Sequence, residues 1–284
     1  MMQSYKKKSY LCTLLEIIKD YTMEKSNSES LSKSRSSRSC IRTGYHLFMS
    51  QFRGIIRRSW IAALAYGLCF STLATILVIY YPRLNLSVLV NPQSLTYVVS
   101  DYIMIFSVTL VAIIAGAIAE LILYATGLKV GKWRTTKAFL STLLVALPLT
   151  ILTFGIGALL ALPLAQSLFS YLFTPGRKYW NNLWPAYKIG FRHWGKWFVV
   201  FLITSILTGV ISSIILLPAN VLCLANIQAN MGVLFDDPLG MPSYSIPLTA
   251  FVMFIAGIIQ GYIRLSMLYV YYVTYESNEK DIVY

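Results

Sequence analysis

Residues 138–173 read AFLSTLLVALPLTILTFGIGALLALPLAQSLFSYLF and contain no charged side chain. A helical crossing of a bilayer takes about 20 apolar residues, so a run of 36 residues is too long for one comfortable helix and short for two. Gly155 and Gly157 suit a turn near its middle, and Pro148 and Pro163 suit bends in its two arms. The number of helices in the fold depends on how this run crosses.

Basic residues flank this run on both sides. Four precede it and five follow it: Lys129, Lys132, Arg134 and Lys137 before, and Arg177, Lys178, Lys188, Arg192 and Lys196 after. Lys and Arg in short loops stay on the cytoplasmic side of a membrane. Both ends of the run are therefore predicted to be cytoplasmic, so that the run crosses outward and returns. A re-entrant hairpin that stops partway is the alternative, and its turn must then be buried in protein or line a water-filled cavity.

The same asymmetry extends over the whole chain. All but two of the 24 Lys and Arg residues gather in four polar segments, which are residues 1–58, 125–137, 174–196 and the tail after 273. The connections between the other apolar runs hold a single basic residue, Arg83. The sequence thus predicts a multi-pass membrane protein with both termini in the cytoplasm.

The composition indicates which partners to expect. Hydrophobic residues make up 57% of the chain and charged residues 12%, whereas soluble domains carry about 25% charged residues. The net charge of +13 is spread over helix ends, which favours the lipid bilayer and its anionic headgroups over nucleic acid as the partner. The four cysteines have no paired or metal-like spacing, so neither a disulfide framework, a metal site nor a cofactor is predicted.

An all-α polytopic bundle of six membrane-spanning helices, arranged as three hairpins, is the predicted fold. The expected spans are 59–81, 98–124, 138–154, 157–173, 198–217 and 247–275, within a transmembrane domain over 44–275. A Ser-, Lys- and Arg-rich arm, residues 1–43, precedes this domain and is expected to be disordered, because its composition cannot bury a core. A short cytoplasmic tail, 276–284, follows.

Basic amphipathic segments precede the hairpins and are expected to lie flat on the membrane surface. The segments are GYHLFMSQFRGIIRRSW (44–60), a weaker copy LKVGKWRTTKAF (128–139), and PAYKIGFRHWGKWF (185–198), in which Pro185 suits the first helical turn. In each, helical spacing separates an aromatic stripe from a basic stripe. The residues predicted to contact the membrane surface are Arg53, Arg57, Lys188, Arg192 and Lys196.

Three motifs carry a resemblance to a known family: FRHWGKWF (191–198), PLGMP (238–242) and YVYYVTYES (269–277). Over residues 44–280 the chain resembles uncharacterised bacterial six-helix integral membrane proteins. It is more distantly similar to the membrane domain of some glycerophosphodiester phosphodiesterases. The resemblance implies a six-helix fold in the bacterial inner membrane. It implies no enzyme activity, because no phosphodiesterase catalytic domain with its His and acidic metal ligands is found in the sequence.

Two charged residues, Glu120 and Arg264, fall inside predicted spans. A charge at that depth costs several kcal/mol unless it is paired or hydrated. The segments AELILY and IRLSMLY place both residues at equivalent positions of the first and third hairpins, so we expect them to pair across the bundle, with Gln260 one turn before Arg264. In the alternative, Glu120 is shallow and Arg264 extends to the headgroups without meeting it.

Other motifs point to structure rather than chemistry. Asp236 and Asp237 in the last outside loop could bind a cation, but a metal site needs more oxygen ligands, and a rigid turn is favoured. His46 and His193 lie on separate surface segments and are not expected to act together. Gly257 and Gly261 form a GxxxG pattern, which permits close helix packing either within the chain or between subunits.

Two functions fit these observations. A membrane scaffold or accessory subunit associated with lipid, with a protein partner or as a homo-oligomer, needs only the packed bundle and the surface helices. The alternative is a transporter of a small solute or lipid, with a polar path near Glu120 and Arg264. An enzyme is not predicted, because few ionisable groups are available inside the spans to act as acid, base or metal ligand.

Overall fold

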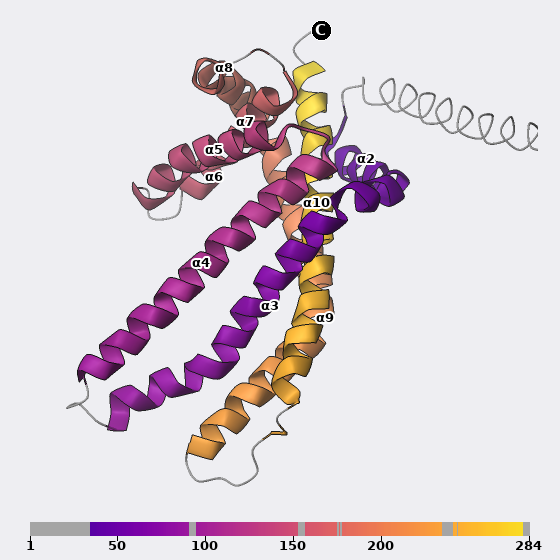
Figure 1. Ribbon diagram of the computed structural model, residues 1–284. Helices are drawn as coiled ribbons and strands as arrows, with labels where there is room; N and C mark the ends of the chain where they lie inside the picture. The colour runs from indigo at the N-terminus through magenta and orange to yellow at the C-terminus, as the bar shows by residue number, and fades with distance from the viewer. Residues whose placement is uncertain are drawn as a thin grey trace, which may run out of the picture.

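The computed structural model describes residues 35–90, 95–152, 157–174, 176, 178–234, 241–242 and 244–280. Its described elements are all helices (Figure 1). Four long helices run side by side along the molecule: α3 (Phe52–Val90), α4 (Leu95–Gly127), α9 (Trp194–Leu234) and α10 (Ser245–Lys280). Each contains a segment long and apolar enough to cross a membrane, namely Phe52–Tyr81, Tyr102–Gly127, Trp194–Gly232 and Ser245–Lys280.

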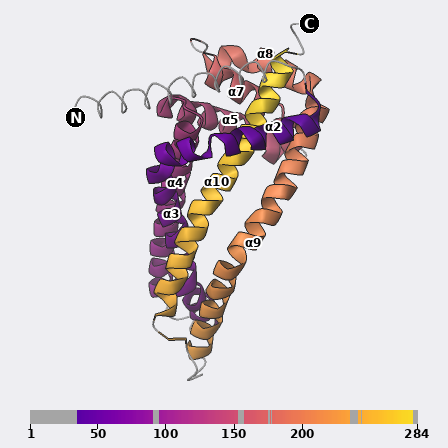
Figure 2. The ribbon, with the colours of Figure 1, turned by 90° about the vertical axis from the view of Figure 1, so that its right-hand side faces the viewer.

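Five shorter helices gather at one end of these four, where α10 ends (Figures 1 and 2). We call them the cap: α2 (Ser37–Ser50), α5 (Lys132–Leu152), α6 (Gly157–Ala161), α7 (Leu164–Phe173) and α8 (Tyr179–Arg192). Buried side chains of the cap and of the last turns of α10 form one continuous core, in which Phe169 and Val273 are almost fully covered. The cap is therefore part of the folded unit.

The central apolar run is divided among α5, α6 and α7. Its charge-free part in α5, residues 138–152, corresponds to about 22 Å of helix, less than the roughly 30 Å of a hydrocarbon core. The other arm holds the apolar helix Leu159–Phe173, which is also shorter than the four candidate crossings. The described residues thus give four candidate crossings where the sequence predicted six. The expected turn at residues 153–156 lies outside the described residues.

The segment 44–60 does not form one flat surface helix. Helix α2 ends at Ser50, and α3 begins at Phe52. Phe48 is buried, and its ring meets Tyr269 of α10 edge to face at 5.6 Å. The apolar stripe therefore packs on α10 rather than on lipid. Residues 1–34 of the predicted disordered arm lie outside the described residues, whereas the last part of the arm already belongs to α2.

Gly44 explains how closely α2 crosses α10. A Cβ atom at this position would lie 2.5 Å from the Cα atom of Val270, so only glycine lets the two backbones meet. Figure 2 shows α2 lying across α10 near the cap end, and α2 also contacts α9. Helix α2 thereby ties these two long helices together at the cap.

The segment 185–198 also differs from the prediction. Helix α8 begins at Tyr179, so Pro185 lies inside the helix rather than in its first turn. The helix is interrupted at His193, where α9 starts. Helix α9 then continues to Leu234 with Pro218 inside it, past the predicted end at 217. A proline removes one helical hydrogen bond but need not end a helix that is held by its neighbours.

Helix α10 lies at the centre of the bundle and contacts α2, α3, α4, α7, α8 and α9. Its crossing with α3 depends on glycine: a Cβ at Gly257 would meet the Cβ of Phe70 at 2.8 Å and the Cα of Gly67 at 3.1 Å. The GxxxG pattern that includes Gly257 is thus used within the chain. Small residues that let backbones approach are typical of helix packing in membranes.

Helix α9 is fastened to α10 at both of its ends. Far from the cap, the buried Asn226 donates to Thr249 Oγ1 at 2.9 Å and accepts from Ser245 Oγ at 2.6 Å. At the cap, Lys196 Nζ donates to Ser277 Oγ at 2.7 Å. The functional candidates lie between these two attachments.

Candidate functional site

An ion pair joins α4 to α10. Arg264 Nη1 donates to Glu120 Oε1 at 3.0 Å. The hydroxyl of Tyr124, one turn after Glu120 on α4, donates to the same carboxylate oxygen. The pairing predicted from the sequence is therefore present. The alternative, in which Arg264 extends to the headgroups without meeting Glu120, is wrong.

The pair lies well inside the helices rather than at a helix end. Glu120 precedes the end of the candidate crossing at Gly127 by seven residues, or about 10 Å at 1.5 Å per residue. The side chain of Arg264 is 43% exposed and that of Glu120 is 20% exposed. The ion pair is thus accessible from one side.

This accessible side is a cleft of about 440 Å³. Four helices contribute to its lining: α4, α5, α9 and α10. The lining residues are Glu120, Tyr124, Phe139, Ser205, Thr208, Gly209, Ser212, Gln260, Arg264, Met267, Leu268 and Tyr271. The cleft therefore places the predicted pair and Gln260 opposite a polar face of α9.

The sequence interpretation missed this face of α9. Ser205, Thr208 and Ser212 follow one another at intervals of three and four residues, which places them on one side of a helix. The other residues around them are mainly Ile, Leu and Val, and many of these are exposed. A polar stripe at helical spacing in an otherwise apolar helix was the available signal, since such a stripe has a reason to avoid lipid.

Three polar atoms in the cleft lack partners. Thr208 Oγ1, Ser212 Oγ and Gln260 Oε1 are buried and make no hydrogen bond with any described residue. Ser212 is 8% exposed and Gln260 is 7% exposed. Buried polar groups are nearly always hydrogen-bonded in folded proteins, and leaving one unpaired costs about 1–3 kcal/mol. All three residues line the cleft that holds the ion pair, so the cleft is suited to water or a polar ligand.

The residues predicted to contact the membrane surface separate into two groups. Arg53, Arg57, Lys188 and Arg192 are exposed. Lys196 is partly covered and donates to Ser277, so it is an internal contact of the bundle. The Cys40 thiol lies nearby, and burial raises its pKa although the charge of Lys196 acts in the opposite direction.

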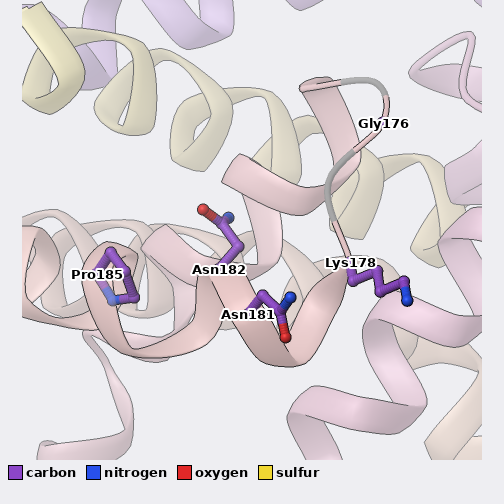
Figure 3. A pocket seen from close by; sticks show the side chains of 5 residues that line it. All are labelled: Gly176, Lys178, Asn181, Asn182 and Pro185. Carbon is purple, nitrogen blue, oxygen red and sulfur yellow. The ribbon is translucent and has the colours of Figure 1, made fainter.

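A second hollow, of about 560 Å³, lies beside the start of α8. Figure 3 shows the residues that line it: Gly176, Lys178, Asn181, Asn182 and Pro185. The side-chain amide of Asn182 already has a hydrogen-bond partner, because it donates to Ser170 Oγ at 2.8 Å. This hollow thus offers a helix start and one lysine, without the unpartnered buried groups of the cleft.

The remaining sequence candidates do not form a site in the described part of the chain. Asp236 and Asp237 lie outside the described residues, and His46 and His193 come from different elements, α2 and the α8–α9 junction. Within the described ranges, no group of three or more His, Cys, Asp or Glu side chains could hold a metal ion.

No protein-family model, no curated protein and no solved structure matches the chain. The described residues form an all-helical fold with four helices long and apolar enough to cross a membrane.

Proposed function

We propose that the protein is a membrane transporter that binds a small polar solute or a lipid head group in the cleft at Glu120 and Arg264. The observation that carries the proposal is the set of buried, unpartnered atoms in the lining of the cleft that holds this ion pair: Thr208 Oγ1, Ser212 Oγ and Gln260 Oε1. A purely structural ion pair has no need of further polar groups around it. A binding site does, because its polar groups become satisfied only when the ligand or water is present.

The orientation follows from charge. We propose that the cap lies on the cytoplasmic side of a bacterial inner membrane, with both termini in the cytoplasm. The exposed Arg53, Arg57, Lys188 and Arg192 belong to the cap or to the helix starts beside it, and basic residues remain on the cytoplasmic side. These residues would contact anionic lipid headgroups.

Residues 138–173 are proposed to form a re-entrant hairpin rather than the fifth and sixth crossings of the bundle. Both arms are short, and α5, α6 and α7 gather at the cap end (Figures 1 and 2). Phe139 of α5 lines the cleft, so the hairpin contributes to the proposed site. Six crossings, in three hairpins, remain the alternative. A cysteine placed at Gly155 distinguishes them, because only a full crossing exposes this position on the face opposite the cap.

Cysteine labelling in membranes tests whether the cleft is a polar path. We expect Gly209→Cys to react with a hydrophilic methanethiosulfonate reagent, because Gly209 lines the cleft, is exposed and has room for a side chain. The background replaces Cys12 and Cys69 by alanine, whereas Cys40 and Cys223 are buried.

The matched control is Ile214→Cys, five residues further on the same helix, whose native side chain is exposed and would face lipid. It should remain unlabelled, because the thiolate that reacts forms in water. The proposal is wrong if Gly209→Cys is as inert as the control, or if both positions react equally.

A scaffold or accessory subunit is the second candidate, and one observation favours it. Three tryptophans of the cap, Trp133, Trp180 and Trp184, are exposed. Aromatic residues are enriched both at protein interfaces and at the headgroup level of membranes. This candidate places the important contacts on the cap, with a partner protein or a second copy of the chain, and leaves the cleft without a ligand.

A further inference from the structure

The cleft combines polar and apolar groups. Phe139, Met267 and Leu268 line it together with the ion pair. Ile113 of α4 lies two turns before Glu120 on the same face of the helix and is exposed. Large exposed apolar surfaces of this kind face lipid. A ligand with a polar head and apolar chains fits both surfaces at once.

The ion pair leaves hydrogen-bonding capacity on both partners. Glu120 Oε1 accepts from Arg264 and from Tyr124, whereas Oε2 accepts no hydrogen bond from the described residues. Arg264 uses only Nη1 in this pair, so Nε and Nη2 remain as donors. A guanidinium recognises phosphate through parallel hydrogen bonds. The site thus presents one acceptor for a cation and a pair of donors for an anion.

The net charge of the pair selects among head groups. One cation and one carboxylate sum to zero, so a zwitterionic ligand leaves the site neutral, while an anionic ligand leaves one uncompensated charge in a poorly solvated place. Gln260 Oε1 is a buried acceptor without a partner, and Gln260 lies one turn before Arg264 on α10. It requires a donor. A primary ammonium supplies N–H donors to Gln260 and Glu120, whereas a quaternary ammonium has none.

We propose that the cleft binds the zwitterionic head group of a membrane phospholipid, with the phosphate on Arg264 and a primary ammonium on Glu120 Oε2 and Gln260 Oε1. Ser212 and its neighbours on α9 would bond the remaining phosphate or ester oxygens. The inference rests on the proposed function and specifies its ligand class as an aminophospholipid of the phosphatidylethanolamine type.

Thermal unfolding of the purified full chain in detergent tests the inference, because a ligand that binds the folded state raises the unfolding midpoint. The probes are phosphatidylethanolamine, phosphatidylcholine and phosphatidylglycerol with identical acyl chains. Glycerophosphoethanolamine and inorganic phosphate provide the head-group chemistry without a lipid. We expect phosphatidylethanolamine to bind roughly tenfold more tightly than the other two lipids, as one charge-assisted hydrogen bond would give.

Glu120→Gln is the decisive variant, since its amide oxygen still accepts from Arg264 and Tyr124 while its charge is lost. It should abolish the preference for phosphatidylethanolamine. Glu279→Gln, the same change in the last turns of α10 outside the cleft, should retain it. If Glu120→Gln does not fold, Gln260→Leu replaces it and should bring phosphatidylethanolamine and phosphatidylcholine to equal affinity.

Several results would overturn the inference. Equal or tighter binding of phosphatidylglycerol would show attraction to anionic lipid alone. If glycerophosphoethanolamine raised the unfolding midpoint as much as phosphatidylethanolamine does, the ligand would be a soluble molecule rather than a lipid. An unchanged preference in the Glu120→Gln protein would place the lipid elsewhere. If any of these results is found and Gly209→Cys is still labelled, the lipid assignment is wrong but the polar path stands. If Gly209→Cys is not labelled, the proposed function itself is wrong.

Discussion

Arg134 shows how one basic residue can serve both topology and packing. It lies in the first turn of α5, and its Nε donates to the carbonyl oxygen of Tyr171 at 2.9 Å. Its Nη2 donates to the carbonyls of Tyr171 and Thr174, at the end of α7. The guanidinium also lies over the ring of Tyr171, 5.0 Å from its centre. A cation at the carbonyl end of a helix is favourable, so Arg134 fixes α7 to α5.

Replacing this residue is expected to loosen the cap. Arg134→Ala should lower the free energy of unfolding by about 1–3 kcal/mol, since it removes hydrogen bonds from a charged group to carbonyls. Arg134→Lys should recover less than half of the loss, because an ammonium lacks the planar fork. Tryptophan fluorescence during thermal unfolding measures both. Lys132→Ala, an exposed position on the same helix turn, is the control, and an equal loss there would contradict the assignment.

At the level of single residues, the sequence predicted the ion pair but not the whole site. Glu120 and Arg264 were identifiable because isolated charges in apolar helices need a partner. Ser205, Thr208 and Ser212 gave no such signal, since Ser and Thr in a membrane helix can bond their own backbone and are individually uninformative. Their common face becomes informative only once α10 is known to lie opposite.

Among the elements, α10 depends most on small residues. Gly257 contacts α3 at a point where a Cβ atom would lie 2.8 Å from the Cβ of Phe70. Gly257→Val is therefore expected to push α3 and α10 apart and to lower the free energy of unfolding by about 1–3 kcal/mol, the usual cost of overpacking. The methyl group of Gly195→Ala on α9 meets nothing within 4 Å, so this change should not lower the unfolding midpoint and should raise it slightly, because alanine favours a helix over glycine. Scanning calorimetry compares the two, and equal midpoints would show that the contact is not tight.

Hydropathy and charge predicted the long helices well and the cap poorly. The four long helices follow from apolar length alone, as α3 and α9 show. Length could not decide whether residues 138–173 span the membrane. Two arms of this size fit either two short crossings or a hairpin that stays within the cap. Nor could an amphipathic pattern show whether the apolar face of α2 meets lipid or α10, since both surfaces are apolar.

In the molecule as a whole, α9 and α10 are held together at both ends, and the region between the two attachments is accessible. Helix α9 is attached to α10 through Asn226 at one end and through Lys196 at the other. Between the two attachments lies the cleft with Glu120 and Arg264. A transporter needs such a division, because its substrate site must exchange ligand while the surrounding bundle remains folded.

A charge-swap series decides whether the Glu120–Arg264 ion pair only stabilises the bundle or also binds the ligand. Glu120→Arg and Arg264→Glu should each lower the thermal unfolding midpoint, because each leaves two like charges facing one another inside the bundle. The double swap should restore most of the midpoint, since opposite charges meet again. It should not restore ligand binding, because the arginine would then face Tyr124 and the carboxylate would lie on α10 beside Gln260. If the pair only stabilises the bundle, the swap does not affect where a lipid binds. A stable double-swap protein that still binds phosphatidylethanolamine would therefore refute the transport function, whereas a stable protein that has lost binding would support it.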